Sequence, residues 1–165
     1  MSHRAAARTT VEVELIPPPD PEVAFRLAAR CATPFFLDTA LPMDGIGRWS
    51  LLGWDPFLTF TAKGEQLHVA DSCGVRSRCG NPFHALRELL ARFRGEPGER
   101  TGYAGGAAGY LAYDLCHFIE RLPARARDDI ALPDLFMAFH DTAVLWNRAE
   151  GRAWVVAAET GAPDR

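Results

Sequence analysis

The sequence predicts an α+β fold built from antiparallel β-sheets with flanking helices. Short segments that alternate apolar and polar residues recur along the chain, separated by turn residues, which is typical of strands joined by hairpins. Two longer segments instead repeat their apolar residues at helical spacing, and each begins with an Asp or Asn followed by a proline. Helices and strands do not alternate regularly, so the sequence disfavours a parallel βαβ arrangement.

Strands dominate the first half of the chain. Val11, Val13 and Leu15 alternate with glutamates, which predicts a strand with one apolar face and one wet face. Asp20 is a good N-cap and Pro21 suits the first helical position, so a helix is expected there. The predicted elements are a strand over 11–15, a helix over 21–30, a short buried strand over 34–37, a loop over 41–47 and strands over 48–52, 57–62, 66–70 and 75–79.

The second half begins with a helix and centres on a glycine-rich segment. Asn81 and Pro82 repeat the N-cap and proline pattern. From Gly102 to Pro123 the chain is expected to run as a strand into a short helix. The predicted elements are a helix from 82 to 93 or 94, a flexible polar segment over 95–102, the strand and short helix of the glycine-rich segment, a polar loop over 124–129 and strands over 135–140, 142–147 and 153–158. The whole chain is thus predicted to have roughly seven to nine strands.

Length and composition favour one globular domain with no nucleic-acid or membrane partner. A chain of 165 residues with a net charge of −3 and scattered arginines lacks a basic patch for nucleic acid. No apolar run is long enough to span a membrane, and the N-terminus lacks the apolar core of a signal peptide, so a cytoplasmic location is expected. We expect a disordered N-terminus over 1–10, one domain over 11–160 and a tail over 161–165.

The sequence carries no recognisable catalytic or metal-binding constellation. The glycine-rich segment is not a phosphate-binding loop, because the chain's only lysine, Lys63, lies elsewhere. Gly105, Gly106 and Gly109 instead suggest that another backbone or a ligand approaches this strand closely. His117 and Glu120 could share one face of a helix and a metal, but without a second such pair a solvated helix face is the better interpretation.

One strand end resembles a small-molecule site. Leu37, Asp38 and Thr39 end an apolar strand, and Arg48, Trp49 and Ser50 begin the next one. An acid, a hydroxyl, a guanidinium and an indole would suit an amino acid, with its carboxylate on Arg48 and its ammonium on Asp38. The alternative is an ordinary turn beside a surface arginine.

Three ordered motifs resemble a known family. They are PFFLDT at 34–39, GRWSLLGWDP at 47–56 and GGAAGYLAYDLCHFIERLP at 105–123, and DDIALPDLFMAFHDTAVLW at 128–146 follows as the next block. Together they resemble the N-terminal region of anthranilate synthase component I and aminodeoxychorismate synthase component I. The resemblance covers nearly the whole chain from about Val11.

The resemblance implies a part of an enzyme that aminates chorismate, with ammonia from a glutamine amidotransferase partner and with Mg²⁺. The family's chorismate- and magnesium-binding residues lie in a C-terminal region that this chain lacks. The segment is therefore expected to be inactive alone, with no catalytic residue, metal ligand or cofactor of its own. Its expected partners are the amidotransferase subunit and its own C-terminal chorismate-binding domain. The implied fold is a sandwich of two large antiparallel sheets with helices outside.

The resemblance also identifies the strand-end site as the family's regulatory amino-acid pocket. That pocket binds tryptophan as a feedback inhibitor in anthranilate synthases and holds it structurally in some aminodeoxychorismate synthases, so tryptophan is the candidate ligand. The family's Leu-Leu-Glu-Ser and Arg-Tyr-Ser motifs match Phe36-Leu37-Asp38-Thr39 and Arg48-Trp49-Ser50.

Departures from the family pattern bear on the branch. Asp38 is one methylene shorter than the glutamate of feedback-regulated anthranilate synthases, and together with YDLCHFIERLP it favours the aminodeoxychorismate branch, which serves para-aminobenzoate and folate synthesis. The alternatives are the anthranilate branch and a free-standing amino-acid-binding or interaction module. A domain cut from a shared sandwich should also expose apolar surface, with Phe35, Leu51, Trp54 and Phe136 as candidates.

Overall fold

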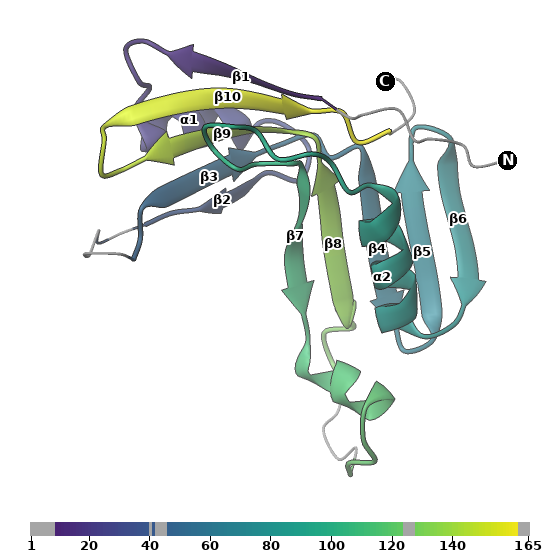
Figure 1. The fold of residues 1–165 in the computed structure, drawn as a ribbon. Coiled ribbons are helices and arrows are strands. Elements are labelled where there is room, and N and C mark those ends of the chain that lie inside the picture. The colour runs from purple at the N-terminus through teal and green to yellow at the C-terminus, as the bar shows by residue number, and fades with distance from the viewer. Residues whose placement is uncertain (1–8, 40, 42–45, 124–127, 162–165) are drawn as a thin grey trace, which may run out of the picture.

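Two five-stranded antiparallel sheets make up the computed structural model, which describes residues 9–39, 41, 46–123 and 128–161 (Figure 1). The first sheet has the order β1 (Thr10–Leu15), β10 (Arg152–Ala158), β9 (Thr142–Asn147), β3 (Trp49–Gly53) and β2 (Phe35–Leu37). The second has the order β6 (Gly74–Cys79), β5 (Gln66–Asp71), β4 (Leu58–Lys63), β8 (Leu135–His140) and β7 (Gly106–Leu111). The predicted α+β class is confirmed, with ten strands among the described residues rather than seven to nine.

The helices begin where the sequence predicts them. Helix α1 (Pro21–Ala28) is capped by Asp20, whose Oδ1 accepts hydrogen bonds from the backbone amides two and three residues later. Helix α2 (Pro82–Arg92) is capped in the same way by Asn81. A 3₁₀ helix, η1 (Tyr113–Phe118), stands where a short helix was expected. Among the described residues, no helix is long and apolar enough to cross a membrane.

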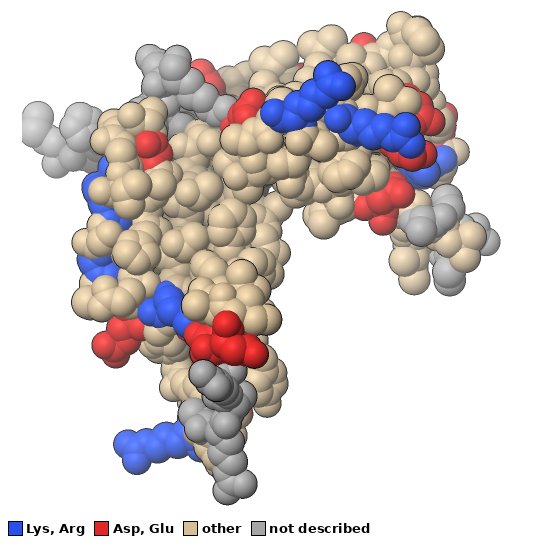
Figure 2. All heavy atoms as spheres, turned by 180° about the vertical axis from the view of Figure 1, so that it is seen from behind, with Lys and Arg blue, Asp and Glu red and all other residues tan. Residues whose placement is uncertain are grey.

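The two sheets meet at a corner. Only Asp141 separates β8 in the second sheet from β9 in the first, and the sheets diverge from this junction (Figure 1). Seen from behind, the molecule has the outline of an inverted L, with basic and acidic side chains interspersed on this face (Figure 2). The buried His140 fills the corner, where its ring packs edge-on against Phe35 at a centroid distance of 4.8 Å and Tyr103 donates a hydrogen bond to its carbonyl.

The second sheet carries the larger core. Leu58, Phe60 and Ala62 alternate along β4 and are buried against α2, as the period of two predicts. Phe57, Phe93 and Phe139 contact one another edge to face, with ring centroids 5.0 to 6.2 Å apart. This core fixes the frame from which β7 and η1 extend (Figure 1).

The first sheet is covered on both faces, by different elements. Helix α1 packs on the face that holds Leu52, Val144, Trp146 and Ala153. Trp49, Leu51 and Trp154 belong to a second cluster, against which Tyr103 packs. Because side chains alternate along β3, Ser50 lies on the α1 side and Trp49 on the other.

The close backbone approach predicted for the glycine-rich strand is confirmed at Gly109. A Cβ atom built there would lie 1.9 Å from the carbonyl oxygen of Phe136 in the adjacent strand β8. At Gly106, in the same strand, a Cβ atom would meet nothing within 4 Å. Only the first of these glycines is therefore required by packing.

Strand β1 does not have the exposed glutamate face and covered valine face that an amphipathic strand would have. Val11 and Val13 are 57% and 53% exposed, whereas the glutamates between them are engaged by Thr101 and Arg152. Glu12 accepts hydrogen bonds from the loop residues Arg100 and Thr101, and Glu14 pairs with Arg152 of β10, so the glutamate face of β1 is the occupied one.

The structure exposes apolar surface, as expected, but not at the four candidate residues. The four candidates are half-buried, because Phe35 packs on His140, Leu51 and Trp54 join the clusters of the first sheet and Phe136 stacks on Tyr110. Exposed large apolar side chains instead include Val11, Val13 and Ile16 in β1 and the segment after it, Tyr113, Ile119, Ile130 and Leu132 around η1, and Leu27, Leu41, Ile46 and Val75 elsewhere.

Candidate functional site

The predicted site lies where β2 ends beside β3. Leu37 pairs with Leu51 in the register of the two strands, so the chain leaves β2 next to the start of β3. This register brings Asp38 and Thr39 beside Ser50, although Ser50 lies more than ten positions further along the sequence. The side chain of Ser50 is fully buried.

A polar network joins Asp38, Thr39 and Ser50. The Ser50 hydroxyl donates to Oδ1 of Asp38 at 2.7 Å and accepts from the backbone amide of Thr39 at 3.1 Å. The Thr39 hydroxyl donates to the carbonyl of Trp49 at 2.8 Å. Oδ2 of Asp38 takes no part in this network, so it can accept a hydrogen bond from a ligand ammonium group.

The other three predicted residues point elsewhere. Leu37 is 58% exposed, and Trp49 packs against Trp154 with ring centroids 5.9 Å apart. Arg48 lies 5.9 Å from the centre of the Trp49 ring and forms an ion pair with Glu150. The structure therefore brings Asp38 together with the hydroxyl groups of Thr39 and Ser50. It does not bring Arg48 to Asp38.

Arg48 and Trp49 line a separate recess of about 310 Å³. Two of its three arginines already have carboxylate partners, because Glu150 pairs with Arg48 and both carboxylate oxygens of Glu14 hold Arg152 at 2.8 Å. The remaining lining residues are Arg100, Asn147 and Trp154. For Arg48 to hold a ligand carboxylate, it would have to exchange Glu150 for the ligand.

Glu12 fastens a strap, residues 95–104, over the Trp49 side of the first sheet. Its carboxylate accepts hydrogen bonds from the amides of Arg100 and Thr101 and from the Thr101 hydroxyl, at 2.6 to 2.9 Å. Partial burial raises the pKa of Glu12, but these hydrogen bonds together outweigh it, so the pKa lies below its ordinary value. The strap in turn holds Tyr103 against Trp49 and Trp154.

The strap is expected to loosen in acid. A folded-state pKa below the unfolded value means that ionised Glu12 stabilises the fold above the ordinary glutamate pKa of about 4.3, and that this contribution is lost as the pH falls through the folded value. Hydrogen exchange should show protected Arg100 and Thr101 amides near neutral pH and loss of that protection in acid. In Glu12→Gln the two amides should be poorly protected at every pH. Strong, pH-independent protection in that variant would contradict this role.

Removal of the Ser50 hydroxyl should weaken the polar network. Ser50→Ala leaves the amide of Thr39 and Oδ1 of Asp38 without their partner, at a cost of about 1–3 kcal/mol in the free energy of unfolding. Ser77→Ala is the matched control, because Ser77 is exposed on β6 and bonded only to His68. Denaturant titration compares the two variants, and equal stabilities would contradict the importance of the network.

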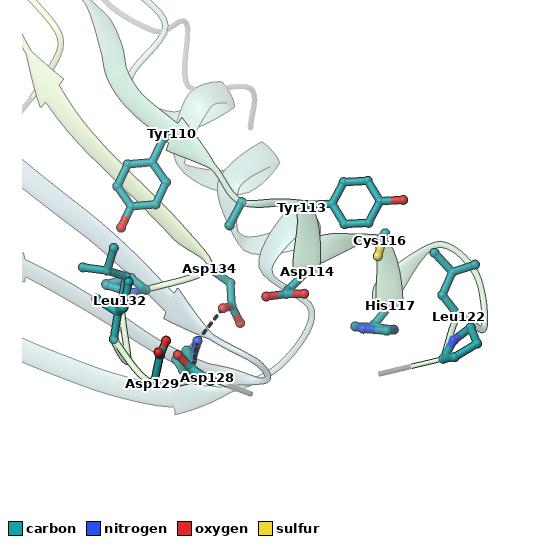
Figure 3. A pocket seen from close by; sticks show the side chains of 15 residues that line it. Tyr110, Tyr113, Asp114, Cys116, His117, Leu122, Asp128, Asp129, Leu132 and Asp134 are labelled. Atoms are coloured by element: carbon teal, nitrogen blue, oxygen red, sulfur yellow. Dashed lines mark hydrogen bonds and ion pairs between the residues drawn. The ribbon is translucent and has the colours of Figure 1, made fainter. Parts of the chain in front are cut away.

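A larger pocket, which sequence reasoning missed, lies where β7 leads into η1 (Figure 3). It has a volume of about 610 Å³, with Tyr110, Tyr113 and Leu132 beside the carboxylates of Asp114, Asp128, Asp129 and Asp134. Figure 3 shows Asp114 of η1 and Asp134 just before β8 near the centre of this site, with Tyr110 of β7 on one side and the Tyr113 ring turned away on the other. The signals in the sequence were the single lysine and the charged 124–129 loop, of which residues 124–127 lie outside the described residues.

Lys63 ties this pocket together. Its ammonium group contacts Asp128 at 2.6 Å and Asp134 at 2.8 Å, and Asp134 also accepts from the amide of Gly64. Hydrogen bonding to Asp128, and next to Asp134, raises the pKa of Lys63, and the same pairing lowers the pKa of Asp128. These groups are already paired, so the arrangement is structural rather than poised for proton transfer. Within the described ranges, no three His, Cys, Asp or Glu side chains gather closely enough to hold a metal ion.

Comparisons with known proteins give a consistent result. The chain is 32% identical over 138 residues to anthranilate synthase component 1 of Mycobacterium tuberculosis, a match that covers 80% of this chain and 27% of that protein. It is 32% identical over 100 residues to aminodeoxychorismate synthase component 1 of Salmonella typhimurium, covering 59% of this chain and 22% of that protein. No protein-family model matches.

A solved structure supports the fold. Anthranilate synthase component I from Streptococcus pneumoniae superposes with a TM-score of 0.57 at 17% identity, covering 72% of this chain and 26% of that one. The chain thus spans about a quarter of the length of the proteins it matches. With the ordered motifs, the two antiparallel sheets and these relatives taken together, the chain belongs to the chorismate-utilising family of anthranilate synthase and aminodeoxychorismate synthase component I.

Proposed function

We propose that the chain is the N-terminal, non-catalytic domain of an aminodeoxychorismate synthase component I, and that it supplies scaffold strands and an amino-acid pocket. The observation that carries the proposal is the polar network of Asp38, Thr39 and Ser50 at the end of β2. The buried Ser50 hydroxyl orients Asp38 through one carboxylate oxygen, and the other oxygen stays out of the network. This arrangement suits recognition of an ammonium group. L-Tryptophan is the candidate ligand.

The reaction itself would belong to the rest of a longer protein. The residues described here include no cluster of His, Cys, Asp or Glu side chains that fits Mg²⁺, so the proposal gives magnesium no ligand among them. Chorismate amination to 4-amino-4-deoxychorismate, and the glutamine amidotransferase that would supply ammonia, are proposed for the assembled enzyme. The role of this chain would be to fold, to hold the amino acid and to support that assembly.

Segment exchange tests the scaffold role. The matched segment of the Mycobacterium tuberculosis anthranilate synthase component 1 is replaced by this chain, and chorismate turnover is compared with that of a protein from which the segment is deleted. The proposal predicts turnover in the exchanged protein and none in the deletion. A folded exchanged protein no more active than the deletion would contradict it.

Two other functions differ in their response to tryptophan. If the chain belongs to the anthranilate branch, L-tryptophan should bind to this domain and inhibit the exchanged protein. If it belongs to the proposed aminodeoxychorismate branch with a structural site, tryptophan should bind without inhibition. A free-standing amino-acid-binding module should bind the ligand yet fail to restore turnover in the exchanged protein.

A further inference from the structure

Strand β1 presents a free edge that lacks lysine, proline and a bulge. It is the outermost strand of the first sheet and pairs only with β10, in an unbroken register over its six residues (Figure 1). Natural edge strands are commonly blunted by lysine, proline or a bulge, because a free edge is a template for another strand. The segment Thr10–Leu15 contains neither lysine nor proline, and its register shows no bulge.

The register shows which backbone groups are open. The amide of Glu159 donates to the carbonyl of Thr9, which makes these two residues a hydrogen-bonded pair. Hydrogen-bonded and non-bonded pairs alternate along an antiparallel ladder, so the groups of Thr10, Glu12 and Glu14 point away from β10. In the described part of the chain, these outward groups make no hydrogen bond to another backbone group.

The two faces of β1 differ in chemistry. Val11 and Val13 lie on the face where Leu15 joins the cluster under α1, and they extend that apolar layer beyond the covered area. Glu12 and Glu14 lie on the opposite face. Glu14 is paired with Arg152, while the strap supplies Glu12 with backbone amides and a hydroxyl. An added strand would thus meet valines on one face and carboxylates on the other.

We propose that β1 accepts an added strand from another polypeptide, an extended segment that alternates apolar and basic residues. Its apolar side chains would cover Val11 and Val13, and its basic side chains would lie beside Glu12 and Glu14. A second copy of β1 fits poorly. The two two-fold antiparallel registers that keep valines on one face with the longest overlap of β1 place Glu12 opposite Glu12 or Glu14 of the other copy, and like charges directly opposite are destabilising.

The test uses the whole 165-residue chain, labelled with ¹⁵N, and an acetylated six-residue peptide that alternates valine and arginine. Saturating peptide should slow hydrogen exchange of the Thr10, Glu12 and Glu14 amides, and leave the exchange rates on β6 unchanged. Val13→Lys should weaken peptide binding by about tenfold or more, because it places a charge on the apolar contact. Val75→Lys is the matched control, since Val75 is 70% exposed on the edge strand of the other sheet.

Several results would overturn the proposal. One is unchanged exchange of the three amides at saturating peptide. Another is equal binding of a peptide with glutamate in place of arginine, or equal weakening by the two lysine variants. Protection of the same amides without peptide, rising with protein concentration and accompanied by dimers in sedimentation, would assign the edge to a second copy instead.

Discussion

Gly109→Ala is expected to lower the stability of the protein by about 3 kcal/mol or more, which corresponds to a fall in Tm of roughly 6–12 °C for a chain of this size. The new methyl group would lie 1.9 Å from the carbonyl oxygen of Phe136, so β7 and β8 cannot keep their present spacing. Backbone cannot move aside as the end of a flexible side chain can. Thermal unfolding followed by circular dichroism measures the change.

Gly106→Ala is the matched control for this prediction. It lies in the same strand, and its added methyl group meets no atom within 4 Å, so its Tm should change by no more than about 2 °C. Equal loss in the two variants would mean that the cost does not come from the close approach to Phe136 at Gly109. Unchanged stability of Gly109→Ala would contradict the close approach of the two strands.

Phe139→Ala is expected to cost about 3–5 kcal/mol of unfolding free energy. Phe139 is 2% exposed and contacts both other rings of the aromatic cluster, Phe57 and Phe93. Truncation removes these contacts and leaves a cavity at the C-terminal end of α2, which cannot collapse because the strands beneath it are fixed by their ladders. Denaturant unfolding provides the measurement.

Tyr113→Ala removes an aromatic ring of similar size at an exposed position. Tyr113 is 82% exposed in η1, so its replacement should change the free energy of unfolding by less than about 0.5 kcal/mol. A cost at Phe139 that is no greater than at Tyr113 would contradict the assignment of the main core to this cluster.

The elements were predictable because their signals are local. Asp20-Pro21 and Asn81-Pro82 each place an acceptor and a fixed φ at a helix start, and both caps form as predicted. Alternation along β4 separates buried Leu58, Phe60 and Ala62 from half-buried Thr59 and Thr61, although Phe57 just before the strand is buried as well. The close contact at Gly109 was also readable, since a glycine within a strand commonly marks the approach of another backbone.

The polarity of β1 could not be read from its own residues. Alternation shows that the valines and glutamates lie on opposite faces, but it does not say which face is covered. That depends on the strap, which brings the amides of Arg100 and Thr101 to Glu12 from far along the chain. A local pattern therefore gave the strand and its two faces, and a distant loop decided their environment.

The candidate site was predictable only in part for the same reason. The register of β2 against β3 joins Asp38, Thr39 and Ser50, three of the six residues that the sequence proposes for the site. The partner of Arg48 comes from the β9–β10 turn, where Glu150 takes its guanidinium. The pairing of Lys63 with Asp128 and Asp134 likewise depends on long-range strand order, which no local motif encodes.

Calorimetric titration of the chain with L-tryptophan tests the proposed amino-acid pocket most directly. The account predicts saturable binding at one site, with affinity reduced at least about tenfold in Asp38→Asn, which removes the charge that would face the ammonium group. Arg48→Ala, run beside it, shows whether Arg48 leaves Glu150 to hold the ligand carboxylate. Absence of binding by a folded sample, or equal affinity in Asp38→Asn, would contradict the claim that this chain carries the pocket.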